Sequence, residues 1–212
     1  MEKALYFHSE RRKEMSKLLG FNEDVLTQTQ LLEYIVLQNK PLKTVLNRIS
    51  EIGDDTMYLA SGSIAQTIWN YQTNMPLITG ISDFDIVYFD EDTSYEAEDK
   101  VIKLVESLTK DIDFEVDVKN QARVHLWIPE KWGREIKPYM SSEDAISSWS
   151  STASCTGLQL KNNKLKIFAP YGLNDIFGQT MRPNRDKVFR ELYDYKVEKW
   201  TKKWNFLNVI PW

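Results

Sequence analysis

The spacing of apolar positions divides the chain into helical and extended stretches. Within residues 1–55 we predict helices, because Leu31, Leu32, Ile35 and Val36 recur at the spacing of one helical face. A second series with the same spacing consists of Leu42, Val45, Leu46 and Ile49. The same criterion predicts further helices at about residues 64–70, 94–109, 143–148 and 186–203.

Extended segments are expected where apolar and polar residues alternate, or where β-branched and aromatic residues cluster. Residues 57–60 and 83–89 are strand candidates on this basis, and residues 71–81 are expected to form a loop. Alternation is sharp over residues 113–118 and again over residues 123–128, so these two segments are expected to form a hairpin. A second hairpin is expected to pair residues 157–160 with residues 165–168.

These elements predict an α+β fold, in which a small mixed or antiparallel β-sheet is packed by helices and preceded by an N-terminal helical segment. The 212 residues are 42% hydrophobic and 27% charged, which is typical of a folded domain. We expect one domain over residues 1–212. It would comprise N-terminal helices at about 1–55, a core at about 56–130 and a C-terminal portion at about 131–212.

Composition excludes several classes of protein. No apolar stretch is long enough to span a bilayer, and the first residues lack the apolar region of a secretory signal, so a cytoplasmic protein is expected. The single cysteine, Cys155, allows no internal disulfide and no cysteine-based metal site. The net charge of -4 argues against general, non-specific binding of nucleic acid. Most large aromatic residues, Trp200 among them, are expected to be packing residues.

The first candidate for chemistry is the Ser61-Gly62-Ser63 segment, which follows a predicted strand and precedes a predicted helix. Gly62 allows the backbone to approach a ligand closely. The free amides and positive dipole end of a helix N-terminus suit a phosphate, and Ser63 adds a hydroxyl donor. A Gly-Ser turn alone is common and would carry no function.

The second candidate is a pair of carboxylates on the strand over residues 83–89. Asp83 and Asp85 leave the same face, where they repel each other unless a cation lies between them. Mg²⁺ or Mn²⁺ is the expected cation, since oxygen ligands and substrate phosphates suit these ions. Asp117 lies on the polar face of another strand and could reach the same point. Asp113 and Glu115 share that face, so alternation alone does not choose among the three.

In this order the motifs resemble the polymerase-β-like nucleotidyltransferase superfamily. The segments Ala60-Ser61-Gly62-Ser63 and Asp83-Phe84-Asp85-Ile86 match its signature. More closely, the chain is similar to a bacterial nucleotidyltransferase-like family related to the head domain of CCA-adding enzymes. That similarity covers most of residues 55–212 and includes segments within residues 116–127, 169–175 and 182–184.

The resemblance implies a role for each residue of the two candidates. Asp83 and Asp85 would hold two Mg²⁺ ions, and Asp117 would bind the ion that activates the attacking hydroxyl. Gly62 and Ser63 would hold the β- and γ-phosphates of a nucleoside triphosphate. The spacer between the two motifs, residues 64–82, is longer than is usual for the superfamily.

Two arginines are further candidates for nucleotide binding. Arg123 suits a triphosphate, but a surface ion pair with Glu115 or Asp113 is an equally open reading. Arg182 is expected to contact the nucleotide or the acceptor. His125 is expected to be structural.

The function expected from these residues is metal-dependent nucleotidyl transfer. A nucleoside monophosphate would pass from a nucleoside triphosphate to a hydroxyl or phosphate acceptor, which could belong to a small molecule, an RNA end or a protein. The alternatives are a non-catalytic nucleotide-binding module and the catalytic subunit of an RNA-modifying assembly. Complete CCA addition is not expected, because the chain lacks the length for the further domains that hold tRNA.

Overall fold

The N-terminal part of the structure consists of two capped helices. The computed structural model describes residues 18–212, so the helical prediction for residues 1–17 lies outside the described residues. Helices α2 (Val25–Val36) and α3 (Lys40–Ser50) confirm helix formation further along. Asp24 caps α2 by accepting from the Thr27 amide at 3.0 Å, and Asn39 caps α3 by accepting from the Leu42 amide.

A five-stranded mixed sheet forms the centre of the molecule, as the alternation predicts. Its strands are β1 (Tyr58–Ala60), β2 (Asp83–Tyr88), β3 (Glu115–Asn120), β4 (Gly157–Lys161) and β5 (Lys164–Phe168). They lie in the order β3-β2-β1-β4-β5. Only β2 and β3 are parallel among these pairs, and helix α5 (Tyr95–Thr109) connects them.

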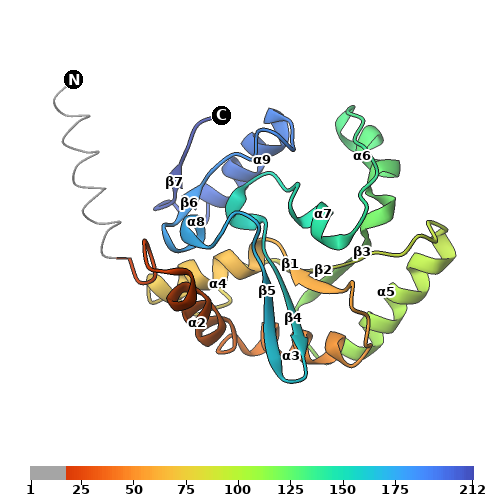
Figure 1. Cartoon of the computed structure of the whole chain (residues 1–212), viewed down its shortest axis with the longest axis horizontal. Helices are drawn as coiled ribbons and strands as arrows, with labels where there is room; N and C mark the ends of the chain where they lie inside the picture. Colours follow the sequence, from red (N-terminus) through yellow and green to blue (C-terminus); the bar gives the residue numbers. More distant parts are fainter. Residues whose placement is uncertain (1–17) are drawn as a thin grey trace.

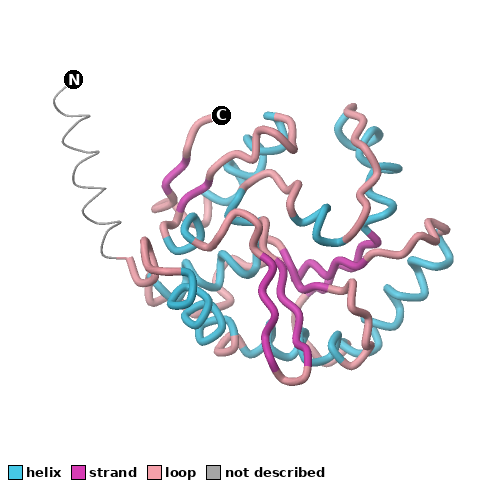
Figure 2. Tube along the Cα trace, viewed as in Figure 1, coloured by secondary structure: helices cyan, strands magenta, loops and turns pink. Residues whose placement is uncertain are grey.

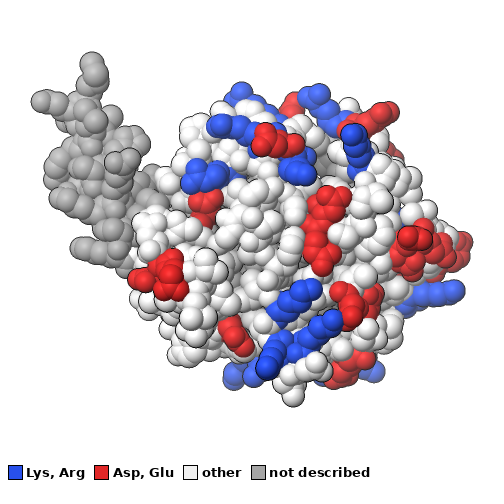
Figure 3. Space-filling view, in the orientation of Figure 1, with Lys and Arg blue, Asp and Glu red and all other residues white. Residues whose placement is uncertain are grey.

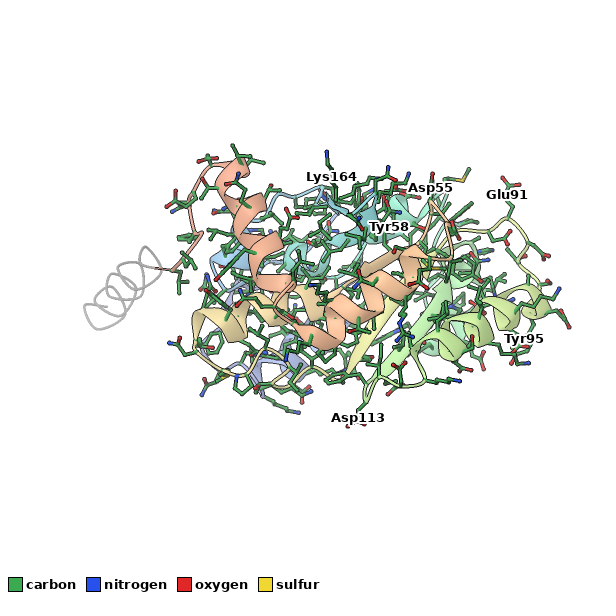
Figure 4. All side chains as sticks on the ribbon, turned by 90° about the horizontal axis from the view of Figure 1, so that it is seen from below. Asp55, Tyr58, Glu91, Tyr95, Asp113 and Lys164 are labelled. Carbon is green, nitrogen blue, oxygen red and sulfur yellow. The ribbon has the colours of Figure 1, made fainter. Side chains whose placement is uncertain are left out.

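The two faces of the sheet carry different helices. Helices α2, α3, α4 (Gly62–Gln72) and α5 cover one face, seen from below in Figure 4. Helices α6 (Val124–Trp132), α7 (Ser142–Ile146) and α9 (Arg190–Thr201) stand on the other side (Figures 1 and 2). Phe84 and Ile86 of β2 belong to the main apolar core with α2–α5, so alternation directs Asp83 and Asp85 to the opposite face.

The predicted hairpin over residues 113–118 and 123–128 is wrong in its second half. Strand β3 ends at Asn120, whose side chain accepts from the Ala122 amide at 3.0 Å and turns the chain into a short 3-10 helix (Gln121–Arg123) and α6. The alternation in this segment is incidental, because Val124 and Ile128 are buried while Leu126, which a strand would bury with them, is 54% exposed. The segment is therefore helical.

The remaining C-terminal elements are short. The hairpin of β4 and β5 confirms the predicted pairing around residues 161–164. Helix α8 (Asn174–Phe177) precedes β6 (Thr180–Met181), which pairs in parallel with β7 (Asn208–Val209). Helix α9 begins at Arg190, later than the predicted start at residue 186. None of the helices within residues 18–212 has both the length and the apolar character needed to cross a membrane.

Candidate active site

A cleft of about 390 Å³ lies on the side of the sheet that faces α6, α7 and α9. Carboxylates of β2 and β3 line its base, and the turn from β1 into α4 lines one side. Side chains from α6 and α9 form the remaining walls. The cleft thus gathers residues from positions 61 to 204 of the chain.

Three carboxylates, Asp83, Asp85 and Asp117, line the cleft, and we call them the carboxylate group. The parallel register of β2 and β3 places Asp117 directly beside Asp85. Of the two alternatives on β3's polar side, Glu115 and Asp113 are exposed, and neither lines the cleft. Figure 4 shows Asp113 at the outer edge of the molecule. The structure therefore favours Asp117 as the third carboxylate.

The carboxylate group carries more negative charge than its surroundings neutralise. Burial raises the pKa of Asp85 to about 6, and the charges of Asp83 and Asp117 add to this rise. Lys196 and a hydrogen bond with Ser61 act in the opposite direction. The other two carboxylates have nearby donors: the Ser82 hydroxyl donates to Asp83 at 2.6 Å, and the Lys119 ammonium donates to Asp117 at 2.5 Å.

These residues fit a divalent cation that binds together with its substrate. Within residues 18–212 no three His, Cys, Asp or Glu side chains already form a metal cage. Mg²⁺ does not require one, because it commonly binds through one or two carboxylates together with water and substrate phosphates. The oxygen donors and the raised pKa of Asp85 both suit Mg²⁺ or Mn²⁺ at this position.

The turn between β1 and α4 has an unusual backbone. Ser61 precedes α4 with φ 72° and ψ -147°, a conformation that is costly for a residue with a side chain. Its amide donates to the carbonyl of Thr156 at 3.0 Å, and this bond holds the turn against the residue that precedes β4. Ser61 makes no side-chain cap to α4, because its hydroxyl is bonded to Asp85 instead. The first amides of α4 are therefore left without a side-chain acceptor.

Ser63, one residue into the helix, adds a second unusual feature. Its side chain lines the cleft and is 2% exposed, yet its hydroxyl has no hydrogen-bond partner among the described residues. A buried hydroxyl without a partner is costly, so it indicates a group that a ligand satisfies. Together with the uncapped amides, it fits the sequence prediction of a phosphate site.

Gly62 is required by packing as well as by any approach of a ligand. A Cβ atom at this position would lie 2.5 Å from Cζ2 of Trp200 and 2.9 Å from Nε2 of Gln66. Trp200 is 4% exposed, and its ring contacts that of Trp69 edge-on at a centroid distance of 5.4 Å. The buried tryptophan thus explains why no side chain fits here, a reason that the sequence did not indicate.

The two predicted arginines lie outside the residues that line the cleft. Arg123 pairs with Glu98 at 3.0 Å and donates to the Thr93 carbonyl, so its acidic partner is neither Glu115 nor Asp113. Arg182 binds Asp175 through two hydrogen bonds of 2.8 and 3.0 Å. Their roles in nucleotide binding stay predictions, and the structure gives both side chains structural partners.

Sequence reasoning missed the contribution of α9. Lys196, Lys199 and Lys203 line the cleft opposite the carboxylate group. Burial lowers the pKa of Lys196, and the nearby Asp85 opposes this shift. Spacings of three and four residues place these lysines on one helical face, and that signal was present in the sequence. The sequence alone does not show that these lysines line a cleft, because that depends on how α9 packs in the fold.

Aromatic side chains occupy the outer part of the cleft. Trp132 of α6 contacts Phe189 at a centroid distance of 5.7 Å and Tyr195 of α9 at 5.6 Å. Trp127 of α6 also lines the cleft, with the Lys131 ammonium 5.6 Å from its ring centroid. The outer cleft therefore offers aromatic surface between α6 and α9.

Known proteins resemble this chain in fold and in sequence. One solved NMR structure, described as revealing a CCA-adding enzyme head domain, superimposes with a TM-score of 0.69 at 27% sequence identity. The match covers 85% of this chain and 96% of that one. A search among functionally curated proteins found no match. A family model described as nucleotidyltransferase matches residues 47–209, so the chain belongs to this nucleotidyltransferase family.

Proposed function

We propose that this protein is a metal-dependent nucleotidyltransferase whose catalytic residues are the carboxylate group. It transfers a nucleoside monophosphate from a nucleoside triphosphate to an acceptor and releases pyrophosphate. Family membership supports nucleotidyl transfer in general. The observation that carries the metal-dependent form is the register of Asp85 beside Asp117, with Asp83 on the same face of the sheet.

The residues of the cleft divide the work between them. Asp83 and Asp85 would hold Mg²⁺ or Mn²⁺. Asp117 would help to bind the ion that activates the acceptor hydroxyl. The bound ion supplies charge neutralisation for the phosphates and favours ionisation of the attacking hydroxyl. The amides at the start of α4 and the Ser63 hydroxyl donate to the phosphates and orient them. No covalent enzyme intermediate is required, because positioning and electrostatics suffice for this reaction class.

The domain boundaries follow the same proposal. Residues 56–130 contain the carboxylates and the turn into α4, and residues 131–212 complete the cleft from α9. The acceptor is a hydroxyl or phosphate group of a small molecule, an RNA end or a protein side chain. An assay with labelled nucleoside triphosphates and each acceptor class distinguishes these three.

The proposal is tested by nucleotide binding with and without metal. A nucleoside triphosphate should raise the melting temperature more in Mg²⁺ than in chelator, because the ion joins the phosphates to the carboxylates. In Asp83→Asn this metal-dependent increment should disappear. Equal stabilisation of the wild type in both conditions would argue against the metal-dependent reaction.

A further inference from the structure

The cleft-facing side of α9 carries a row of positive charge. The lysine row consists of Lys196 and Lys199 of α9 and of Lys203 in the turn after it, and all three line the cleft. Lys203 donates to the Gly80 carbonyl at 2.7 Å, whereas Lys196 and Lys199 have no salt bridge among the described residues. Lys202, on another side of the same helix, is paired with Glu198 at 2.7 Å. Figure 3 shows Lys and Arg side chains gathered over α9 and α6 at the upper edge.

Trp200 places Lys196 close to the start of α4. The Lys196 ammonium lies 4.7 Å from the centroid of the Trp200 ring, within the range of a cation–π interaction. The same ring fills the space beside Gly62. One buried ring therefore contacts both the helix terminus and the ammonium, which brings a positive charge to the uncapped amides and to the buried Ser63 hydroxyl.

Lys196 already interacts electrostatically with Asp85 and Asp83, but the donors at the start of α4 have no anionic partner of their own. The first amides of α4 have no side-chain acceptor, and the Ser63 hydroxyl has no partner in the described chain. Lys196 and Lys199 are near enough to influence each other's charge, and this repulsion would be relieved by a ligand of opposite sign. Along the helix axis the backbones of the two lysines are separated by about 4.5 Å, so both ammonium groups can reach neighbouring phosphates of one polyphosphate chain.

We propose that Lys196 and Lys199 bind the β- and γ-phosphates of the nucleotide, completing a polyphosphate site that begins at α4. We expect this site to bind triphosphates more tightly than monophosphates, because a chain of phosphates offers more charge and more acceptor oxygens to the Ser63 hydroxyl, the helix amides and the two ammonium groups. This inference rests on the proposed function for the identity of the ligand as a nucleoside triphosphate. Binding of the polyphosphate itself requires no turnover.

The test measures binding of inorganic tripolyphosphate by calorimetry in chelator. The variants are Lys196→Met and Lys199→Met, which remove the ammonium group and leave an apolar side chain of similar length. Lys202→Met, on the same helix outside the cleft, is the matched control. Loss of a charge-assisted contact should raise the Kd about tenfold or more for Lys196→Met, with a smaller rise for Lys199→Met. The control should retain the wild-type Kd, and Lys196→Arg should recover most of the affinity.

A nucleoside monophosphate is the second ligand, and its Kd should change far less in Lys196→Met than that of tripolyphosphate. Equal weakening in Lys196→Met and Lys202→Met would overturn the proposal, because the effect would then be one of net charge. Wild-type protein that does not bind tripolyphosphate would overturn it too. Melting curves verify that the variants are folded. If Lys196→Met does not fold, the binding data for Lys199→Met and Lys196→Arg test the proposal instead.

The two proposals fail in different ways. If Lys196→Met weakens tripolyphosphate binding but no acceptor is ever labelled, the polyphosphate site stands and the enzymatic proposal falls. If transfer is observed and Lys196→Met binds tripolyphosphate as the wild type does, the enzyme stands and the role of α9 falls.

Discussion

The two sides of the cleft differ in charge and in how they are built. The carboxylate group lies on two adjacent strands, where pairing of Asp85 with Asp117 sets its arrangement directly. The lysine row lies on α9 and on the turn after it, which reach the same cleft through buried contacts of Trp200 and Trp204 with Trp69. The negative side thus depends on strand register, and the positive side depends on packing between segments far apart in sequence.

This difference has a functional meaning. Carboxylates suit a cation and the reacting phosphate, whereas ammonium groups and helix amides suit the phosphates that leave. A change that damages packing should therefore affect binding through α9 while leaving the strands in place. A change of charge on the strands should affect chemistry while leaving the fold intact. The variants below separate these two outcomes.

The largest effect is expected for Trp200→Ala. Removing this buried ring deletes the contact with Trp69 and leaves a cavity. It should therefore lower the free energy of unfolding by about 3–5 kcal/mol. Urea unfolding in chelator measures the change. Trp127→Ala, on the half-buried face of α6, is the matched control and should cost clearly less. Similar losses in the two variants would contradict the central position given to Trp200.

Asp83→Asn should act on chemistry instead. The substitution keeps the shape of the side chain and removes a charge that the metal needs. It should reduce kcat about 10²–10³-fold, the usual effect of removing one electrostatic group from an active site. Turnover of labelled nucleoside triphosphate, once an acceptor is known, gives this value. A melting temperature in chelator well below that of the wild type would instead mark Asp83 as a structural residue.

Asp85→Asn should stabilise the protein in the absence of metal. The pKa of Asp85 in the folded state, about 6, lies above its ordinary value, so the folded state holds this proton more tightly. The protonated form favours folding at low pH, and that contribution is lost as pH rises through about 6. At pH 8 in chelator the variant should gain about 2–3 kcal/mol over the wild type.

The control for Asp85→Asn is the pH dependence itself. Its advantage over the wild type should shrink steadily between pH 7 and pH 4, because the wild-type carboxyl becomes protonated in the same range. Denaturant titrations at a series of pH values measure this. A difference that does not vary with pH would show that Asp85 is not under electrostatic strain.

Gly62→Ala should have the smallest effect of the four. The added methyl group would lie 2.5 Å from the buried Trp200 ring, so α9 must shift, at a cost of about 1–3 kcal/mol. Because the shift moves Lys196 with its helix, the variant should also bind tripolyphosphate more weakly. Gly133→Ala is a suitable comparison, since an added Cβ there meets no atom within 4 Å, although its φ of 63° adds some backbone strain. Unchanged stability and binding in Gly62→Ala would contradict the proposed link through Trp200.

The elements that carry the negative side of the cleft could be predicted from the sequence. The strand over Asp83–Tyr88 and the helix after Gly62 follow from local pattern, and the register then brings Asp117 beside Asp85. Pattern alone did not separate Asp117 from Glu115, because both occupy one face of β3. Exposure separates them, and exposure depends on which helices cover the strand end.

The positive side could not be predicted in the same way. Lysines spaced along a helix usually face solvent, and nothing local to Lys196 indicates that α9 packs beside Gly62. The strand prediction for residues 123–128 is wrong for a related reason. A short alternating segment is compatible with both a helix and a strand, and only its tertiary packing distinguishes them. A strand would bury Leu126 together with Val124 and Ile128, whereas in the helix that follows Asn120 the Leu126 side chain is 54% exposed.

The buried hydrogen bond from the Trp204 indole to the Asn70 side chain, 2.9 Å long, spans 134 residues of sequence. A ribosome adds roughly 5–20 residues per second, so the segment around Asn70 is made roughly 7 to 27 seconds before its partner. Once Asp117 has been made, the nascent chain contains all three carboxylates and the start of α4, but it still lacks Lys196, Lys199, Trp200 and Trp204. If Lys196 and Lys199 bind the phosphates as proposed, affinity for polyphosphate arises late in biosynthesis, when α9 docks, and not when the nucleotidyltransferase motifs emerge.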